Sequence, residues 1–391
     1  MGRQLEHHDI LYDLDLSKRK RLKVGIDVSL LKRSGGVANY IGHLLSGLKK
    51  AHRNEHYTLF YNSFQNSRRL EIDPFFRVAS FRIPDRVLKY LWLHLRYPPI
   101  ERLIGPVDVF HSPAHSPVYT YCPPAKRWVV TVHDLFTFKL NYRKEIQAHE
   151  MKVLKIIDKK ASRVIADSHS TRNDLIEMIP GLASRTVVIH LGVDEKFFSA
   201  NCPPKTLQKY GIEGTYILYV GAGDFHKNLI RLINVYKRMS NIFPHSLVLA
   251  GKITERYRPI MEWVEKLNLS HRVIFTDTVA EDDLPAVYKG ADLFVLPSIY
   301  EGFGLVLPEA MACGTPVVAS RISSIPEVVG DAGELFDPYN EDNMYDVCQT
   351  VLSDPERRRR MQIMGVEWAR RFSWQKMAEE TRKIYEEVSG T

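Results

Sequence analysis

The chain has 391 residues, of which 45% are hydrophobic and 26% are charged. This length and composition are typical of a globular protein with two domains, each large enough to bury its own core. No apolar run reaches eighteen residues and the first residues lack the apolar core of a signal peptide, so we expect a cytoplasmic protein. Four well-separated cysteines form no Cys-x-x-Cys pair, which argues against a disulfide framework or a zinc site.

The net charge of +8 is unevenly distributed along the chain. Residues 1–200 contain 32 Lys and Arg against 20 Asp and Glu, a net +12, whereas residues 201–391 contain 22 against 26, a net −4. The basic half is expected to favour peripheral contact with anionic membrane surfaces or anionic acceptors, and no nucleic acid partner is expected. The Lys18–Arg21 cluster contributes to this charge, although a solvated tail explains it equally well.

Short β-rich runs alternate with helical stretches in the first half, as in a doubly wound parallel sheet. A strand over 22–28 is followed by a Gly-rich loop and a helix over 37–50, and Ser168 is predicted to cap a later helix. Residues 86–96 have apolar positions at helical spacing, which favours a core-facing helix over a membrane anchor and leaves both open. Further strands are predicted at 57–61, 76–81, 108–110, 128–132, 163–166 and 187–189.

The alternation restarts after a proline-containing connector near residue 200, where we place a hinge. Strands are predicted at 216–220, 246–250, 273–275, 293–296 and 316–319, and amphipathic helices at 355–371 and 374–388. The predicted fold is α/β, with two Rossmann-like doubly wound parallel-sheet domains. We assign residues 1–198 to the first domain, 199–372 to the second and 373–391 to a final helix.

The segment from Glu301 to Glu309 joins a predicted strand to a predicted helix and reads Glu-Gly-Phe-Gly-Leu-Val-Leu-Pro-Glu. It places two carboxylates eight residues apart, one on a Gly-rich loop and the other about a turn and a half into the helix. Glycines let the backbone approach a ligand, a helix N-terminus offers N–H groups to phosphate, and a carboxylate accepts hydrogen bonds from a vicinal diol. This pattern suits a sugar nucleotide bound at the carboxyl edge of a parallel sheet.

This segment, preceded by Pro297-Ser298 and continuing through Ala310 to Pro316, resembles the signature of the retaining glycosyltransferases of family 4. The resemblance implies the two-domain GT-B fold with a central cleft and a nucleoside-diphosphate sugar as donor. It also implies retention at the anomeric carbon, with the departing phosphate oxygen taking the proton of the acceptor hydroxyl. In such enzymes the final helix crosses back to the first domain, and Phe372-Ser-Trp374 resembles the start of that crossing.

The two glutamates then have separate expected roles. Glu301 would accept hydrogen bonds from sugar hydroxyls, and Glu309 would hold the ribose hydroxyls. Base recognition is expected from backbone near Lys252 and residues 276–279. The donor-binding N–H groups are expected just before the helix and at its start: Phe303, Gly304, Leu305 and Val306.

A second phosphate site is predicted after the strand over 216–220, where Gly221 is followed by His226 and Lys227 just before a helix. Lys227 can neutralise the diphosphate as negative charge builds on the leaving group, so we assign it a catalytic role. Many family members carry an Arg directly after the first glycine, where this chain has Ala222. His226 or Lys227 must therefore cover the phosphates.

The first half offers the facing wall. Its Gly35-Gly36 turn leaves room for the diphosphate and the acceptor. The resemblance places His133 near the transferred sugar as a catalytic contact, although a lone His at a strand end is more often structural. Candidate acceptor contacts flank these two places: Asp134, Arg33 and Asn39.

Several alternatives remain open at this point. GDP-mannose is the first expectation for the donor because of the Lys227-Asn228 pair, with UDP-hexoses close behind, and the acceptor is expected to be a glycan or a lipid-linked glycan. An epimerase or phosphorylase of the same fold, or a glycan-binding relative without turnover, would also fit. A glycosidase is disfavoured because the Gly-rich loops suit nucleotide transfer. No metal or other cofactor is expected, since the Asp13-Leu14-Asp15 motif precedes any core strand.

Overall fold

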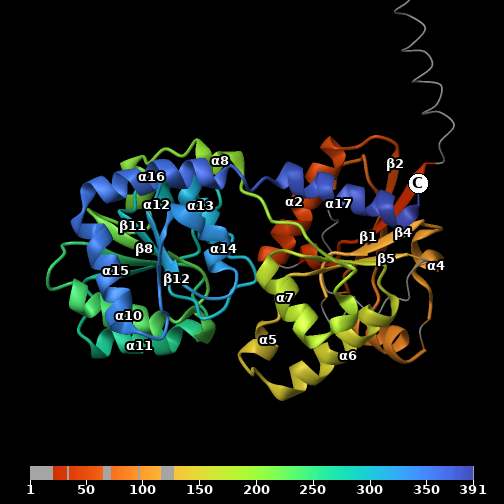
Figure 1. Ribbon diagram of the computed structural model, residues 1–391, viewed down its shortest axis with the longest axis horizontal. Coiled ribbons are helices and arrows are strands. Elements are labelled where there is room, and N and C mark those ends of the chain that lie inside the picture. The colour runs from red at the N-terminus through yellow and green to blue at the C-terminus, as the bar shows by residue number, and fades with distance from the viewer. Residues whose placement is uncertain (1–20, 33–34, 65–71, 96, 116–126, 391) are drawn as a thin grey trace, which may run out of the picture.

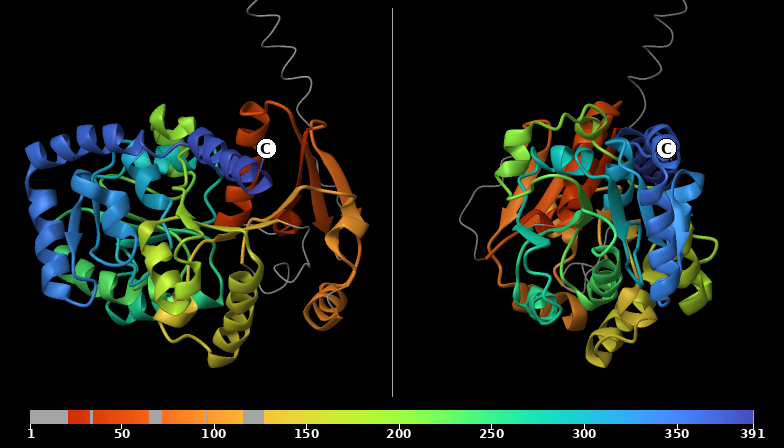
Figure 2. Two further views of the ribbon diagram at one scale, coloured as in Figure 1. Left: turned by 45° about the vertical axis from the view of Figure 1, so that its right-hand side comes forward. Right: turned by 90° about the vertical axis from the view of Figure 1, so that its left-hand side faces the viewer.

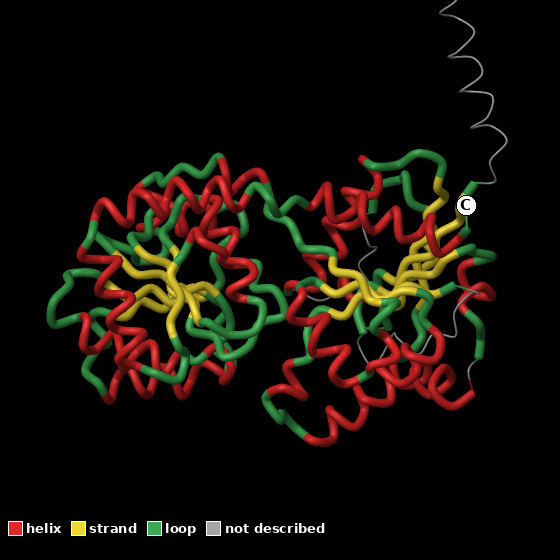
Figure 3. The backbone as a smooth tube through the Cα atoms, viewed as in Figure 1, coloured by secondary structure: helices red, strands yellow, loops and turns green. Residues whose placement is uncertain are grey.

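A computed structural model describes residues 21–32, 35–64, 72–95, 97–115 and 127–390. Figure 1 shows two lobes side by side, and Figure 3 shows strands at the centre of each lobe with helices on both sides. Every pairing between named strands is parallel. The prediction of two doubly wound α/β domains is therefore confirmed.

The first sheet has the strand order β3-β2-β1-β4-β5-β6-β7. The strand order reverses beside β1, and such switch points open the ligand-binding crevice at the carboxyl ends of the strands. The observed strands lie within two residues of the predicted ranges. Their bounds are β1 Leu22–Asp27, β2 Glu55–Asn62, β3 Arg77–Phe81, β4 Val109–Ser112, β5 Trp128–Val132, β6 Arg163–Ala166 and β7 Thr186–Val188.

The helix predicted over 86–96 is divided into two elements, α3 (Asp85–Tyr90) and a π-helical turn, η2 (Leu91–Leu95). Leu88 and Trp92 are buried in the core, whereas Val87 is 47% exposed and Leu95 59% exposed. The core-facing prediction is thus right for one side of this segment only. The other elements of this half are η1 Ser29–Lys32, α2 Gly36–Lys50, α4 Ile100–Ile104, α5 Phe136–Lys139, α6 Lys144–Lys160, α7 His169–Met178 and η3 Pro180–Leu182.

The second sheet has the order β10-β9-β8-β11-β12-β13. Its edge strand was not predicted, because three residues are too few to show an alternation pattern. The strands are β8 Tyr216–Val220, β9 Ser246–Ala250, β10 Val273–Asp277, β11 Leu293–Leu296, β12 Val317–Ser320 and β13 Glu334–Phe336. The α-helices are α8 Glu195–Phe198, α9 Pro204–Gln208, α10 Leu229–Met239, α11 Arg258–Lys266, α12 Leu284–Lys289, α13 Val306–Ala312, α14 Ile325–Val329, α15 Glu341–Ser353 and α16 Pro355–Ala369, and the 3-10 turns are η4 Phe225–Lys227, η5 Glu255–Tyr257 and η6 Gly330–Ala332.

The chain passes between the lobes twice, and the two passages touch where Val193 N–H donates to the Phe372 carbonyl oxygen at 3.2 Å. The final helix, α17 (Trp374–Ser389), starts there and packs along α2 of the first lobe, as Figures 1 and 2 show. Arg382 of α17 is 3% exposed, and its Nη1 lies 3.0 Å from Glu55 Oε1 at the start of β2. The first domain is therefore completed by the last residues of the chain.

No helix in the described ranges combines the length and the hydropathy needed to cross a bilayer. Three cysteines, Cys202, Cys313 and Cys348, are free, in agreement with the sequence prediction. Cys122 lies outside the described residues.

The contact between α2 and α17 can be tested at Gly47. A Cβ atom there would lie 2.4 Å from Ala378 Cβ and 3.2 Å from the Trp374 carbonyl oxygen. We expect Gly47→Ala to lower the free energy of unfolding by about 1–3 kcal/mol relative to Gly42→Ala, measured by urea titration. Gly42 lies on the same helix with no atom within 4 Å of its Cβ position, so its substitution controls for helix propensity. Equal effects of the two substitutions would contradict close packing at Gly47.

Candidate functional site

The predicted site residues of the two halves meet where the loop after β11 touches the turn after β5. A Cβ atom on Gly302 would lie 2.1 Å from the His133 carbonyl oxygen and 2.8 Å from Asp134 Cβ, so only glycine permits this approach. Ser168 Oγ and Thr171 Oγ1 of the first domain donate hydrogen bonds to the Gly302 carbonyl oxygen at 2.7 and 3.1 Å. The Gly-rich loop of the second domain is therefore held directly on the first domain.

Other contacts at this interface were not predicted from the sequence. The Tyr300 hydroxyl donates to Asp174 Oδ2 at 2.8 Å and accepts from Leu135 N–H at 3.3 Å. Ser168 caps α7 as predicted, since its Oγ accepts from Thr171 N–H at 3.0 Å. The sequence does show a tyrosine, Tyr300, directly before the Glu301 motif. Its partner Asp174 lies far away in the chain, so no local pattern in the sequence indicated their contact.

Lys227 and Glu301, assigned separate roles from the sequence, bind each other in this structure. Lys227 Nζ lies 2.7 Å from Glu301 Oε1, and Ser298 Oγ donates to the same oxygen at 2.6 Å. Burial opposes ionisation of Glu301, but the charge of Lys227 and these hydrogen bonds outweigh it and hold the pKa of Glu301 below its ordinary value. The pair is an ionised, partly buried couple at the centre of the site.

His226 lies against the first domain and has an unused nitrogen. Its ring centroid is 5.3 Å from that of Phe136, across the domain interface. Burial and the neighbouring Lys227 lower the pKa of His226, so its imidazole is neutral at pH 7. Its Nδ1 atom is buried and finds no hydrogen-bond partner among the described residues. A ligand atom beside Lys227 could supply that partner.

His133 has both ring nitrogens engaged by acceptors. Nδ1 lies 2.6 Å from Asp167 Oδ2, and Nε2 lies 2.7 Å from the Pro113 carbonyl oxygen. Burial lowers the pKa of His133, but the Asp167 carboxylate outweighs burial and raises it, which favours the imidazolium form. Sequence reasoning missed Asp167, which directly follows β6 beside β5. The contact of His133 with a sugar stays a prediction, and it would require release of the Pro113 hydrogen bond.

Asp134, a predicted acceptor residue, lies close to this charged cluster. Burial raises the pKa of Asp134, whereas a hydrogen bond from Phe136 N–H and the charge of His133 oppose that rise. Its carboxyl group is thus placed on the side of the site that the first domain provides.

Glu309 lies in the first turn of α13, earlier in the helix than predicted, because the helix begins at Val306. The Tyr288 hydroxyl donates to Glu309 Oε2 at 3.0 Å. Burial raises the pKa of Glu309 to about 7 despite this hydrogen bond. The two glutamates of the motif therefore differ, since Glu301 is ionised and Glu309 titrates near neutral pH.

The other residues that the sequence assigned to the donor site lie directly after a strand or at and before the start of a helix. Gly35 caps α2 and Gly36 begins it, and no heavy atom of the described residues outside their chain neighbours and the α2 backbone lies within 4 Å of either Cβ position. Asn39 is exposed on the first turn of α2, whereas Arg33 lies outside the described residues. Gly221 follows β8, where a Cβ would lie 2.5 Å from the Tyr219 hydroxyl oxygen. Phe303 is buried beneath the loop, and Gly304, Leu305 and Val306 are partly exposed before and at the start of α13.

A cluster of two histidines and a glutamate links the domains near this site. The ligand atoms of His169, His190 and Glu327 lie within 4.8 Å of one another. Glu327 already accepts hydrogen bonds from His190 Nε2 at 2.6 Å and from two backbone N–H groups at the start of α7. The adjoining pocket also contains Arg371 and Lys376, whose charges disfavour a cation. We interpret the cluster as a polar contact between domains.

Comparisons with known sequences give consistent matches over both halves. The family described as "Glycosyltransferase Family 4" matches residues 34–197, and the family described as "Glycosyl transferases group 1" matches residues 205–368. O-antigen chain mannosyltransferase B of Escherichia coli is 31% identical over 280 residues, covering 69% of this chain and 73% of that protein. Serotype-specific mannosyltransferase WbdA of Escherichia coli is 31% identical over 277 residues, covering 66% of this chain but 34% of that protein.

Solved structures show the same two-domain arrangement. Sucrose-phosphate synthase from Thermosynechococcus elongatus has a TM-score of 0.78 and 23% identity, with 95% of this chain and 100% of that chain covered. WaaG, a glycosyltransferase involved in lipopolysaccharide biosynthesis, has a TM-score of 0.72 and 16% identity, with 94% of this chain and 100% of that chain covered. At these identities the likeness establishes the fold, which is the expected GT-B arrangement.

Proposed function

Because this chain belongs to the group 1 glycosyl transferases of glycosyltransferase family 4, we propose that it is a retaining hexosyltransferase with GDP-mannose as donor. The observation that carries the proposal is the Lys227–Glu301 pair, which combines a cation and an ionised carboxylate where the two domains meet. A nucleotide sugar presents the complementary groups, a diphosphate and a ring of hydroxyls. Two relatives named as mannosyltransferases support mannose as the sugar.

Donor binding would replace the contacts within this pair. The diphosphate takes over Lys227, and the sugar hydroxyls donate to Glu301, so each charge keeps a partner when the site fills. The unused Nδ1 of His226 supplies a further hydrogen bond beside Lys227. N–H groups of residues 303–306 and the carboxylate of Glu309 complete the diphosphate and ribose contacts.

The neighbouring Asn228 supports Lys227 structurally. Asn228 is buried in the left-handed conformation with φ 59°, and its amide donates to the carbonyl oxygens of Pro297 at 3.0 Å and Pro338 at 2.9 Å. It therefore fixes the turn that carries Lys227 against the end of β11. The choice of GDP-mannose over a UDP-hexose consequently rests on the relatives and not on the Lys-Asn pair.

Positive groups are the catalytic equipment that such a transfer needs. The bond from the anomeric carbon to the phosphate oxygen breaks, the bond to the acceptor oxygen forms on the same face, and the acceptor proton passes to the phosphate oxygen. Lys227 stabilises the charge that develops on the leaving diphosphate. The His133 imidazolium, held by Asp167, adds positive charge on the first-domain side, and Asp134 would orient the acceptor hydroxyl.

The exposed side of α3 and η2 supports peripheral membrane contact for a lipid-linked acceptor. Val87, Tyr90 and Leu95 are 47%, 58% and 59% exposed; Arg86 directly precedes Val87, and Lys89 directly precedes Tyr90. Apolar and basic side chains in this combination favour an anionic bilayer surface. The segment follows the carboxyl end of β3, on the same edge of the sheet as the candidate site.

Membrane contact can be tested by co-sedimentation with vesicles of anionic and neutral lipid. We expect the double variant Val87→Ser and Leu95→Ser to lower partitioning onto anionic vesicles at least about tenfold, because two apolar side chains no longer enter the bilayer. The matched control, Ile363→Ser and Met364→Ser, removes two exposed apolar residues from α16, and it should partition like the unchanged protein. Equal partitioning of all three proteins would contradict membrane contact through α3 and η2.

The donor is tested by thermal shift and turnover with a panel of nucleotide sugars. We expect GDP-mannose to raise Tm and to be turned over with an acceptor, with retention visible as the anomeric configuration in the proton NMR spectrum of the product. Lys227→Ala should lower kcat/KM by about 10²–10³-fold, because a charged donor to the leaving group is lost. Lys266→Ala, an exposed lysine on α11, should leave it unchanged.

Three results would overturn parts of this proposal. Turnover of a UDP-hexose and not of GDP-mannose would show that the proposed donor is wrong. Inversion at the anomeric carbon would exclude the proposed mechanism. If no nucleoside diphosphate protects the protein and Glu309→Ala changes nothing, the transferase proposal fails.

Donor affinity should depend on pH through Glu309. Its pKa of about 7 means that the carboxyl is largely protonated at pH 6 and ionised at pH 8. Only the ionised form accepts hydrogen bonds from both ribose hydroxyls, so the affinity for an intact sugar nucleotide should rise about tenfold from pH 6 to pH 8. Calorimetric titration measures this, and Glu309→Gln should flatten the profile. A rise that persists in Glu309→Gln would assign the titration to another group.

A further inference from the structure

A second pocket lies at the edge of the first sheet opposite the candidate site. Its volume is about 470 Å³, and it is lined by the amino-terminal ends of β1, β2 and β3 and by the turn before β4. Because all these strands are parallel, their carboxyl ends lie at the other edge, where the donor residues meet. The proposed function therefore makes no use of this pocket.

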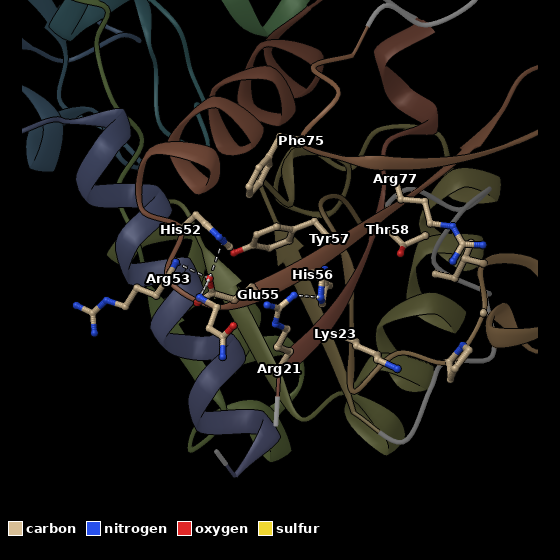
Figure 4. A pocket seen from close by; sticks show the side chains of 14 residues that line it. Arg21, Lys23, His52, Arg53, Glu55, His56, Tyr57, Thr58, Phe75 and Arg77 are labelled. Atoms are coloured by element: carbon tan, nitrogen blue, oxygen red, sulfur yellow. Dashed lines mark hydrogen bonds and ion pairs between the residues drawn. The ribbon is translucent and has the colours of Figure 1, made fainter. Parts of the chain in front are cut away.

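The lining of the pocket is strongly basic. Arg21, Lys23 and Arg77 are exposed and extend from the strand ends, as Figure 4 shows, with His56 between them and Arg53 turned away. Among the described residues that line the pocket, the single carboxylate is Glu55. The pocket thus carries part of the positive charge that the sequence concentrates in its first half.

The charge of Glu55 is already neutralised from within the protein. Nη1 of Arg382, on α17, lies 3.0 Å from Glu55 Oε1. The backbone N–H groups of Arg53 and Asn54 donate to Glu55 Oε2 at 2.8 and 3.1 Å. Burial opposes ionisation, but these hydrogen bonds and the Arg382 charge keep the pKa of Glu55 below its ordinary value. No carboxylate in the described lining remains to balance the basic side chains.

The basic side chains of the pocket are not used by the fold. The Lys23 ammonium and the Arg77 guanidinium make no hydrogen bond or ion pair with any residue that the structure describes, and Arg21 contacts only the His56 ring, at 3.1 Å. Lys49, in the same domain but outside this pocket, is by contrast paired with Asp73. Three uncompensated cations around one concavity create a positive potential that is relieved when an anion binds.

The pocket wall holds one further unpaired group. Tyr57 lines the pocket and is 3% exposed, and its hydroxyl has no hydrogen-bond partner in the described part of the chain. A buried hydroxyl without a partner is unfavourable unless a ligand or water satisfies it. Figure 4 shows that this hydroxyl points toward His52 and away from Arg21, Lys23 and Arg77, so the contacts available to an anion come from the basic side chains.

We propose that this pocket binds an anion with one or more phosphate groups, at a site separate from the donor site. Guanidinium groups match phosphate oxygens in geometry, and three cations exceed what a single carboxylate ligand requires. A volume of 470 Å³ also accommodates a group attached to the phosphate, so a phosphorylated metabolite and a phosphorylated lipid headgroup share the required chemistry.

The proposal is tested by calorimetric titration of the full chain with two probes, pyrophosphate and a short-chain phosphatidic acid kept below its micelle concentration. We expect binding of at least one probe, with affinity at least tenfold weaker in the double variant Lys23→Gln and Arg77→Gln, since each lost charge-assisted hydrogen bond weakens binding by about that factor. The probe that binds more tightly identifies the source of the phosphate.

The controls separate this pocket from the donor site. Arg360→Gln removes an exposed arginine from α16 in the other domain, and it should leave the affinity unchanged. Lys227→Ala should prevent pyrophosphate from binding at the donor site. Binding that survives in Lys227→Ala but is lost in the Lys23 and Arg77 double variant therefore belongs to this pocket. If Lys227→Ala does not lower turnover, the proposed function is contradicted, but the proposed anion site is not. The anion site is overturned if neither probe binds, or if the double variant binds both probes as tightly as the Arg360→Gln control.

Discussion

The candidate site depends on the close approach of the Gly302 backbone to the turn at His133 and Asp134. No side chain fits at Gly302, because its Cβ would lie 2.1 Å from the His133 carbonyl oxygen, far inside van der Waals contact. The hydrogen bonds from Ser168, Thr171 and Tyr300 then fix the Gly-rich loop of one domain on the strand ends of the other. Without this contact the cation and carboxylates of the second domain would face solvent instead of the first-domain histidine and aspartate.

The site keeps its charges ionised by internal pairing. Lys227 with Glu301, and His133 with Asp167, are each partly or fully buried, and each charge has a partner at hydrogen-bond distance. Removing one partner from such a pair is costly because it leaves an unpaired buried charge. A ligand that brings both an anion and hydroxyl donors can divide the Lys227–Glu301 pair without that cost. This explains why a preformed ion pair is compatible with binding of a nucleotide sugar.

The first domain has two unrelated basic features at opposite edges of one sheet. The α3 and η2 segment combines basic and apolar residues at the carboxyl edge, whereas Arg21, Lys23 and Arg77 surround a pocket at the amino edge. Their separation follows from the parallel topology, which gives every strand the same direction. Part of the excess charge of the first half thus lies at each edge of the sheet, and the two proposed roles, membrane contact and anion binding, use different residues.

The sequence by itself determined the elements and the candidate residues. Short apolar runs located twelve of the thirteen strands in the described ranges, because buried parallel strands need continuous β-branched and apolar residues. The Glu301–Glu309 spacing and the Lys227 turn located the candidate donor residues, because short motifs carry local geometry. The structure alone decided which residues pair. Asp167 with His133, Tyr300 with Asp174, and Lys227 with Glu301 are separated by 34, 126 and 74 positions, and such partners are chosen by chain topology and packing, which leave no local pattern in the sequence.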